Sequence, residues 1–519
     1  MAVAAGLLAS GCASAPIGDA ALADLARAEA LILEGCYDCL IEARDAYARV
    51  GVGRARPLVV ARLFESEVLI ALRERELALD SAEAEARAAS LVPELPPEVD
   101  GDRVLAAVRA VLPDKVGVSK ERMSGLRRAP PRRGLDVAGE LTWLRSVPLS
   151  TSVRRYVEMS FDCAFDAIRG PAGRPFRPLR ERPEVADDAP PLLRYRAAIC
   201  FGLDAEPLER ILEASPRFVE AAYFVARSRL VNAQNNGAPG TRPLLEQADE
   251  RFPSSPAVSY VYGNFLQLIG DCREAVRFYA ATLDLEAAHE AAQLGQVVCL
   301  SFLKAHDEAI AEAGTLLDWG RYHIPEAYYW RAWNHHVQGN LPAARENIES
   351  AKKIASTGEI HTLAGVIEHD QHELGPAEKD LGVALGLAYG NRNCTAMWYL
   401  GLVHMKQERW PDSAGAFEQA MDCYRQNVLE SEAALRTMER RTDVDPDFKV
   451  SQIAGFQVAI KEDRAQYHAA AFNAANQHTR GGNIARAREL IEVAAKDPAL
   501  ADLVGQLREI LRKIGGGAP

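Results

Sequence analysis

Apolar and small residues recur through most of the chain at the spacing of amphipathic helices, and no stretch shows the alternation with period two that strands require. The segment Ser259–Leu285 is representative of this pattern. It contains a first run with Gly263 among apolar residues, a turn signal at Gly270, and a second run with Ala275 and Tyr279. We therefore expect two antiparallel helices joined by a tight turn, with Gly263 and Ala275 where the two backbones approach.

Small residues recur at matching points of such hairpins, about every 34 positions. They are Gly263, Gly295, Ala332, Gly365 and Gly401, and the steps between them are 32, 37, 33 and 36 residues. Two helices that cross closely leave room only for Gly or Ala at the crossing. One hairpin cannot bury its apolar face alone, so the period predicts a stack of hairpins that share a continuous core.

These positions resemble the tetratricopeptide repeat (TPR) family, whose unit of 34 residues has small residues at positions 8, 20 and 27. With Gly401 at position 8, Ser413 and Ala420 fall at positions 20 and 27. Ala332 and Gly365 begin two further matches, and a fourth lies near the C-terminus. The resemblance implies an all-α, tetratricopeptide-like α-α solenoid, a superhelix of antiparallel helix pairs that binds a protein or peptide.

The family's concave positions, carried onto this sequence, give candidate residues for a partner-binding groove. They are Tyr260, Asn264, Tyr329, Trp333, His336, His369, Asp370, Trp398 and Lys406. Aromatic anchors among polar groups suit a peptide-binding surface. The same spacing also fits tryptophans that pack against adjacent helices, and the sequence leaves both interpretations open for Trp333 and Trp398.

The first residues of the chain resemble the signal of a bacterial lipoprotein. A short apolar run is followed by Ala9-Ser10-Gly11-Cys12, which is similar to a lipobox. The resemblance implies that Cys12 is lipidated and that residues 1–18 are signal and tether. The protein would then be anchored in the cell envelope, at the outer membrane facing the periplasm in a Gram-negative cell. The basic region expected before the apolar run is missing, so an unprocessed N-terminus and a cytoplasmic adaptor remain the alternative.

The chain contains nine cysteines, and lipidation of Cys12 would leave an even number. Most spacings are wide and irregular, unlike those of a small disulfide scaffold. The one tight pair, Cys36 and Cys39, lies where a helix is predicted to begin, a position that lowers the pKa of a thiol. Redox folds place this motif after a strand, and none is predicted here. We therefore favour a structural pair, such as a local disulfide, and keep a thiol-redox protein as an alternative.

Composition divides the chain into regions of different character. They are N-terminal helical repeats at 19–113, a Pro/Arg-rich linker with short helices at 114–190, the main array at 191–424, a helical insertion or unusually long hairpin at 425–466, and the last repeat with a capping helix at 467–519. The basic run at 127–133 is either a solvated stretch or a contact for an anionic surface.

Several classes of function lack support in the sequence. A net charge of −12 disfavours nucleic acid as the main partner, and no stretch is apolar enough to span a membrane. There is no Gly-rich phosphate loop, G-x-S-x-G elbow or H-E-x-x-H helix, so we predict neither an enzyme nor a cofactor. His336 and His369 share one repeat position, about 10 Å apart on stacked helices, which is too far for one zinc ion. No metal is predicted.

Overall fold

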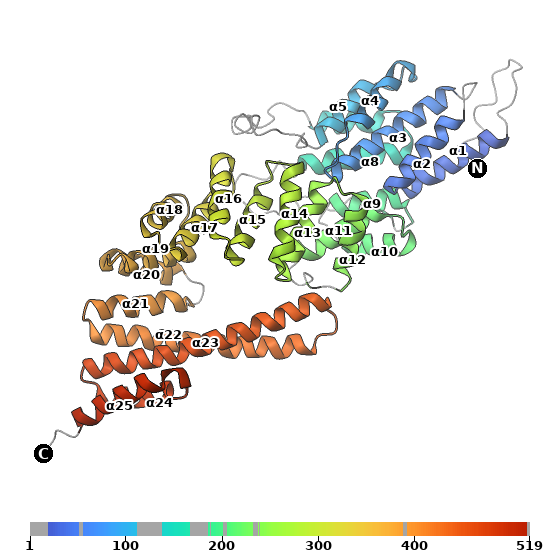
Figure 1. Cartoon of the computed structure of the whole chain (residues 1–519). Coiled ribbons are helices and arrows are strands. Elements are labelled where there is room, and N and C mark those ends of the chain that lie inside the picture. Colours follow the sequence, from blue (N-terminus) through green and yellow to red (C-terminus); the bar gives the residue numbers. More distant parts are fainter. Residues whose placement is uncertain are drawn as a thin grey trace, which may run out of the picture. The chain divides into compact units, whose positions relative to one another are not determined.

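The computed structural model describes residues 19–50, 56–111, 137–166, 185–186, 188–200, 205–231, 237, 239–387 and 392–515. These residues form helices joined by turns, and no strand occurs among them (Figure 1). Contacts divide the chain into two compact units, the first ending at Val261 and the second beginning at Tyr262, with Gly237–Gly240 in the second. Cys12, the rest of residues 1–18 and the basic run at 127–133 lie outside the described residues.

The first unit is a series of helices of 10 to 21 residues. They are α1 (Asp19–Glu34), α2 (Tyr37–Arg49), α3 (Arg56–Glu76), α4 (Ala82–Leu91), α5 (Gly101–Val111), α7 (Val137–Ser146), α8 (Thr151–Asp166), α9 (Pro191–Cys200), α10 (Ala205–Ala214), α11 (Val219–Val231) and α12 (Thr241–Arg251). Helices α7 and α8 fall in the region expected to be a linker. Helix α8 packs against α3, α5 and α9 and buries Tyr156 and Val157, so this part of the region belongs to the core of the unit.

Helix α13 (Pro256–Leu268) leads into the second unit, in which helices pack in chain order. They are α14 (Cys272–Leu285), α15 (Glu290–Phe302), α16 (His306–Trp319), α17 (Ile324–Val337), α18 (Leu341–Ile354), α19 (Gly358–Asp370), α20 (Leu374–Leu387), α21 (Cys394–Lys406), α22 (Trp410–Arg440), α23 (Pro446–Arg480), α24 (Ile484–Ala494) and α25 (Ala501–Gly515). From α14 to α25 each helix packs on the next helix along the chain, which is the arrangement of a repeat solenoid. The predicted all-α, tetratricopeptide-like fold is confirmed.

The recurring glycines are required by bulky side chains on an adjacent helix. A Cβ atom on Gly263 would lie 2.8 Å from Tyr279 Cε1, and one on Gly295 would lie 2.5 Å from Tyr279 Cζ. Tyr279 is fully buried, and its hydroxyl lies 2.9 Å from Asn264 Oδ1. Its ring therefore fills the space where α13, α14 and α15 meet. In the same way, a Cβ atom on Gly365 would lie 2.6 Å from Leu381 Cγ.

Two helices are much longer than a repeat helix. Helix α22 has 31 residues and α23 has 35, and they pack along each other (Figure 1). The region 425–466 consists of the end of α22, the turn and the start of α23. No helix in the described part of the chain is both long enough and apolar enough to cross a bilayer.

All eight cysteines in the described residues are paired in disulfides. The pairs are Cys36–Cys39, Cys163–Cys200, Cys272–Cys299 and Cys394–Cys423. The first closes the start of α2, and the others join α8 to α9, α14 to α15, and α21 to α22. Each of these three therefore fastens a helix to the next helix in the described chain.

Candidate functional site

A cavity of about 990 Å³ opens in the second unit against α17, α19 and α21, which are the first helices of three successive pairs. We call it the groove. Its lining also includes residues just before α19 and α21. The lining residues are Tyr329, Trp333, His336, Ser356, Thr357, Gly358, Glu359, Thr362, Leu363, Val366, Leu387, Arg392, Asn393, Thr395 and Tyr399.

Three aromatic rings line the groove. Tyr329 and Trp333 on α17 and Tyr399 on α21 are all half-buried, so each ring keeps an exposed part. Trp330 packs edge-on against both Tyr329 and Trp333, with ring centroids 5.5 and 5.7 Å apart, and does not line the groove. Trp330 therefore supports the two groove rings of α17, and all three groove rings belong to partly exposed residues.

A carboxylate connects two of the helices that form the groove. Asp370 accepts hydrogen bonds of 2.9 Å from His336 Nε2 and from His369 Nδ1. Burial raises the pKa of Asp370, but the two imidazole hydrogen bonds lower it more, and the net pKa is below its ordinary value. Burial lowers the pKa of His369, which also packs edge-on against the Tyr399 ring at 5.4 Å.

The connections before α19 and α21 are held by side-chain hydrogen bonds. Asn393 Oδ1 accepts from the Ala396 N–H at 3.0 Å and caps α21, while its Nδ2 donates to Thr362 Oγ1 at 2.6 Å. Thr357 caps α19 by accepting from the Ile360 N–H at 3.3 Å. These caps fix the ends of both helices where they border the groove.

A buried cluster of charges lies on α18, α19 and α20 beside the groove. Lys352 Nζ donates to Asp380 Oδ2 at 2.6 Å and to Glu349 Oε1 at 2.8 Å. Glu368 is 3 % exposed, and carboxylate oxygens of Glu349, Glu368 and Asp380 lie within 4.8 Å of one another. Burial and the charge of Asp380 raise the pKa of Glu368 to about 7, against the opposing effect of Lys352. The cluster also includes His361, whose Nδ1 is 2.8 Å from Asp380 Oδ1.

The predicted groove residues separate into three groups. Tyr329, Trp333 and His336 line the groove, and His369 and Asp370 are joined to His336 by hydrogen bonds. The remaining residues do not line it. Trp398 packs edge-on against Phe417 at 5.4 Å, and Lys406 Nζ lies 3.4 Å from the His369 carbonyl oxygen. Asn264, on α13, accepts a hydrogen bond from the Tyr279 hydroxyl on α14, and Tyr260 belongs to the first unit.

The lining residues that the sequence did not indicate come partly from the helix connections, which supply Ser356, Thr357, Arg392 and Asn393, and partly from α19, α20 and α21. Asn393 is the N-cap of α21 and accepts from the N–H of Ala396, three positions later. Asn is a preferred N-cap residue, so the sequence carried a signal for this position. Tyr399 lies one position after Trp398 and lines the groove, although the family's concave positions select Trp398. Ser356 and Glu359 carry no signal in the repeat pattern.

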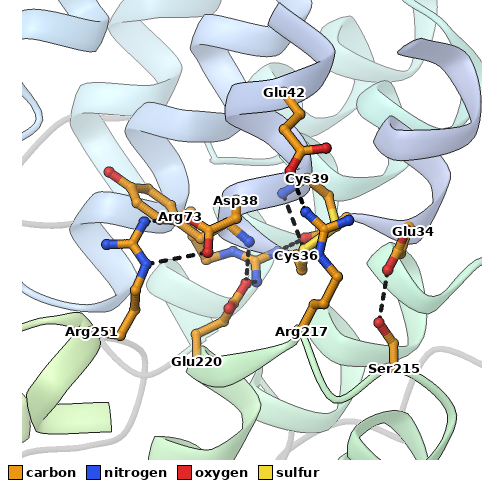
Figure 2. Close-up of a disulfide and its surroundings, with 12 residues drawn as sticks. Glu34, Cys36, Asp38, Cys39, Glu42, Arg73, Ser215, Arg217, Glu220 and Arg251 are labelled. Carbon is orange, nitrogen blue, oxygen red and sulfur yellow. Dashed lines mark hydrogen bonds and ion pairs between the residues drawn. A yellow bond between two sulfur atoms is a disulfide. The ribbon is translucent and has the colours of Figure 1, made fainter. Parts of the chain in front are cut away.

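The Cys36–Cys39 disulfide lies in a different setting, inside the first unit (Figure 2). Both cysteines are fully buried, and Cys36 Sγ accepts from the Cys39 N–H at 3.1 Å. Ion pairs of Asp38 with Arg251 and of Glu42 with Arg217 hold α2 on residues from α12 and from the turn before α11. Because an attacking thiolate must reach a sulfur atom, this burial favours the structural interpretation of the pair.

Next to this disulfide, two fully buried charges neutralise each other. Arg73 Nη1 donates to Glu220 Oε1 at 2.6 Å, and Arg73 Nη2 donates to the Gly35 carbonyl oxygen at 3.0 Å. The same Glu220 oxygen accepts from the Tyr37 N–H at 2.7 Å (Figure 2). The Tyr195 ring covers Arg73, with 3.9 Å from Cζ to the ring centroid. The turn between α1 and α2 is thus fastened to α3 and α11.

No family model matches the chain, and no curated protein matches it significantly. Among solved structures the chain is similar to YrrB, described as a TPR protein with an unusual peptide-binding site, at 15% identity over 34% of this chain and 91% of that one, with a TM-score of 0.30. It is similar to yeast Tom70 at 14% identity over 95% of each chain, with a TM-score of 0.35. A chain of the APC/C hetero-tetramer Cut9–Hcn1 gives 13% identity over 90% and 95%, with a TM-score of 0.36.

Proposed function

We propose that the protein is a helical-repeat scaffold that binds an extended segment of a protein partner in the groove formed by α17, α19 and α21. The observation that carries the proposal is the composition of the groove, in which three aromatic rings line one cavity together with Ser356, three threonines and the amide of Asn393. Aromatic anchors usually supply most of the energy of an interface. Hydroxyl and amide groups can satisfy the backbone of an extended peptide.

The size and placement of the groove support a macromolecular segment as its occupant. A cavity of about 990 Å³ lies at the upper end of the range for ligand sites. Its lining comes from three consecutive repeats, and stacked repeats characteristically bind partners along surfaces of this extended kind. We therefore propose a protein or peptide partner and no cofactor.

The proposal includes the cell envelope as the location. Disulfides persist in oxidising compartments and are rare in the cytosol, and the eight described cysteines form four of them. A cytoplasmic adaptor would have to keep these cysteines reduced. Cys12 is the proposed site of a lipid anchor. Labelling cells with radioactive palmitate should mark the wild type and leave a Cys12→Ala variant unmarked, and an unmarked wild type would refute the anchor.

Panning a phage-displayed library of random dodecapeptides against the full chain tests the groove. The enriched peptides are then synthesised and their affinities measured. Trp333→Ala should cost roughly 1–3 kcal/mol of affinity and leave the helical signal intact. Trp410→Ala is the matched control, because Trp410 on α22 packs against Arg480 and does not line the groove. Peptides that bind both variants as well as the wild type would place their site elsewhere and contradict the proposal.

A further inference from the structure

A serine, a histidine and an aspartate at one edge of the groove have the arrangement of a nucleophile, a general base and an orienting carboxylate. Ser356 Oγ lies 2.9 Å from His361 Nε2, and His361 Nδ1 lies 2.8 Å from Asp380 Oδ1. An ionised carboxylate can only accept, so Nδ1 donates to Asp380, and in the neutral imidazole Nε2 then accepts from the serine hydroxyl. This is the tautomer in which an imidazole can remove a hydroxyl proton.

The three side chains differ in exposure as this chemistry requires. Ser356 is exposed and lines the groove, whereas His361 and Asp380 are 9 % and 6 % exposed. Burial raises the pKa of Asp380, but hydrogen bonds from Lys352 and His361 lower it more, and the net pKa is below its ordinary value. The hydroxyl is therefore reachable from the groove, and an ionised carboxylate holds the shielded imidazole in place.

The start of α19 supplies hydrogen-bond donors beside the serine. Helix α19 begins at Gly358, two residues after Ser356. The first N–H groups of a helix have no acceptor within it, and Gly358 and Glu359, which carry the first two, both line the groove. The positive end of the helix dipole lies at the same place. Negative charge that develops on a substrate oxygen next to Ser356 would be stabilised there.

We propose that Ser356 is an acylating nucleophile, with His361 as its general base and Asp380 as a positioning residue, and that this site hydrolyses a carboxylic ester. The apolar side chains of Leu363 and Val366 in the same groove favour an ester with an apolar acyl chain. This activity goes beyond the binding function proposed above, because it adds a covalent step at one edge of the groove.

The step balances with water as the only co-reactant. Ser356 Oγ attacks the carbonyl carbon of the ester while its proton passes to His361 Nε2. The bond between that carbon and the alkoxy oxygen then breaks, and His361 returns the proton to the departing alcohol. A water molecule, deprotonated by His361, attacks the acyl-serine and releases the carboxylic acid and the serine hydroxyl.

A biotinylated fluorophosphonate tests the nucleophile on the full, oxidised chain, because an activated serine displaces its fluoride. Peptide mass spectrometry should find the label on Ser356 in the folded protein and not after heat denaturation. Hydrolysis of p-nitrophenyl butyrate should fall roughly 10²–10⁴-fold in Ser356→Ala and His361→Gln. Ser350→Ala, which removes a hydroxyl that donates only to the Glu346 carbonyl oxygen, should keep the wild-type rate.

The role of Asp380 is tested by the pH–rate profile of hydrolysis, whose shape would not change if Asp380 were only structural. Asp380→Asn no longer fixes the imidazole tautomer, so it should lower the rate and change the shape of the pH–rate profile. Thermal denaturation of each variant shows that it is folded, and Ser356→Ala, which loses one hydroxyl and its hydrogen bond to His361, should remain folded.

Two results overturn the inference. One is a folded wild type that takes no label at Ser356, and the other is a folded Ser356→Ala variant that hydrolyses the ester at the wild-type rate. Peptide affinity is measured on the same proteins. Peptide binding without labelling refutes the hydrolytic site and leaves the scaffold proposal standing. Labelling without peptide binding supports the hydrolytic site and contradicts the scaffold proposal.

Discussion

Replacing Glu368 by glutamine should make the protein more stable at pH 8 and have a several-fold smaller effect at pH 5. Glu368 is 3 % exposed beside Asp380 and Glu349, and its pKa is raised from 4.5 to about 7, first by burial and then by the charge of Asp380. Three carboxylates therefore lie together near a single ammonium group. That group, Lys352 Nζ, donates to Glu349 and Asp380, and His361 also pairs with Asp380. A glutamine amide keeps the shape and can donate to the Asp380 carboxylate at every pH.

The sign and size of the effect follow from the two pKa values. Below pH 4.5 the Glu368 carboxyl is protonated in the folded and unfolded states, and its contribution to stability is fully present. As the pH rises to about 7, the unfolded chain ionises freely while the folded one resists, so that contribution is lost. A difference of about 2.5 pKa units corresponds to a loss of roughly 3 kcal/mol above pH 7.

Urea denaturation followed by circular dichroism at pH 5 and pH 8 measures the effect, and amide hydrogen exchange on α19 shows where it acts. The local measurement matters because stacked repeats need not unfold in one step. Glu346→Gln, an exposed position on α18, is the matched control. If the advantage of Glu368→Gln is the same at both pH values, or if Glu346→Gln shares it, burial of the carboxyl is not its cause.

Three further changes test the packing. Gly365→Ala introduces a Cβ atom 2.6 Å from a buried leucine, so it should cost roughly 1–3 kcal/mol, read as a lower melting temperature. Replacing Cys394 and Cys423 together by alanine removes a link between residues 29 positions apart, which should cost about 3–4 kcal/mol in oxidised protein and clearly less in dithiothreitol, where only the packing of the two sulfur atoms is lost. Arg73→Met leaves Glu220 buried without its cation and should cost about 3–5 kcal/mol, whereas a near-neutral effect on melting would mean that water or another cation replaces it.

The repeat fold was predictable because its rule is local and recurs. A small residue and a bulky one 16 positions later meet where two helices cross, as Gly263 meets Tyr279 and Gly365 meets Leu381. Those pairs leave a period that one sequence shows by itself. The helices at 137–166 were predicted as well, but their burial was not, since proline and arginine around them gave the region the composition of a linker.

The groove was predicted less well, because it depends on how helices end and on contacts between residues far apart in sequence. The family pattern found Tyr329 and Trp333 on α17 but selected Trp398 on α21, where the neighbouring Tyr399 lines the groove. A rotation of one position along a helix, about 100°, decides which ring faces inward. Ser356 and Asp380 are 24 positions apart on different elements, and no periodic pattern connects them.

The order of the disulfides has a consequence for how the chain matures. Each cysteine in the described residues pairs with the next one along the sequence: 36 with 39, 163 with 200, 272 with 299, and 394 with 423. If the chain enters an oxidising compartment N-terminus first, every native partner within these residues is the most recently arrived free thiol. Oxidation in order of arrival then gives the native pairs directly, and maturation of this part of the chain depends on an oxidant alone and not on an enzyme that reshuffles bonds.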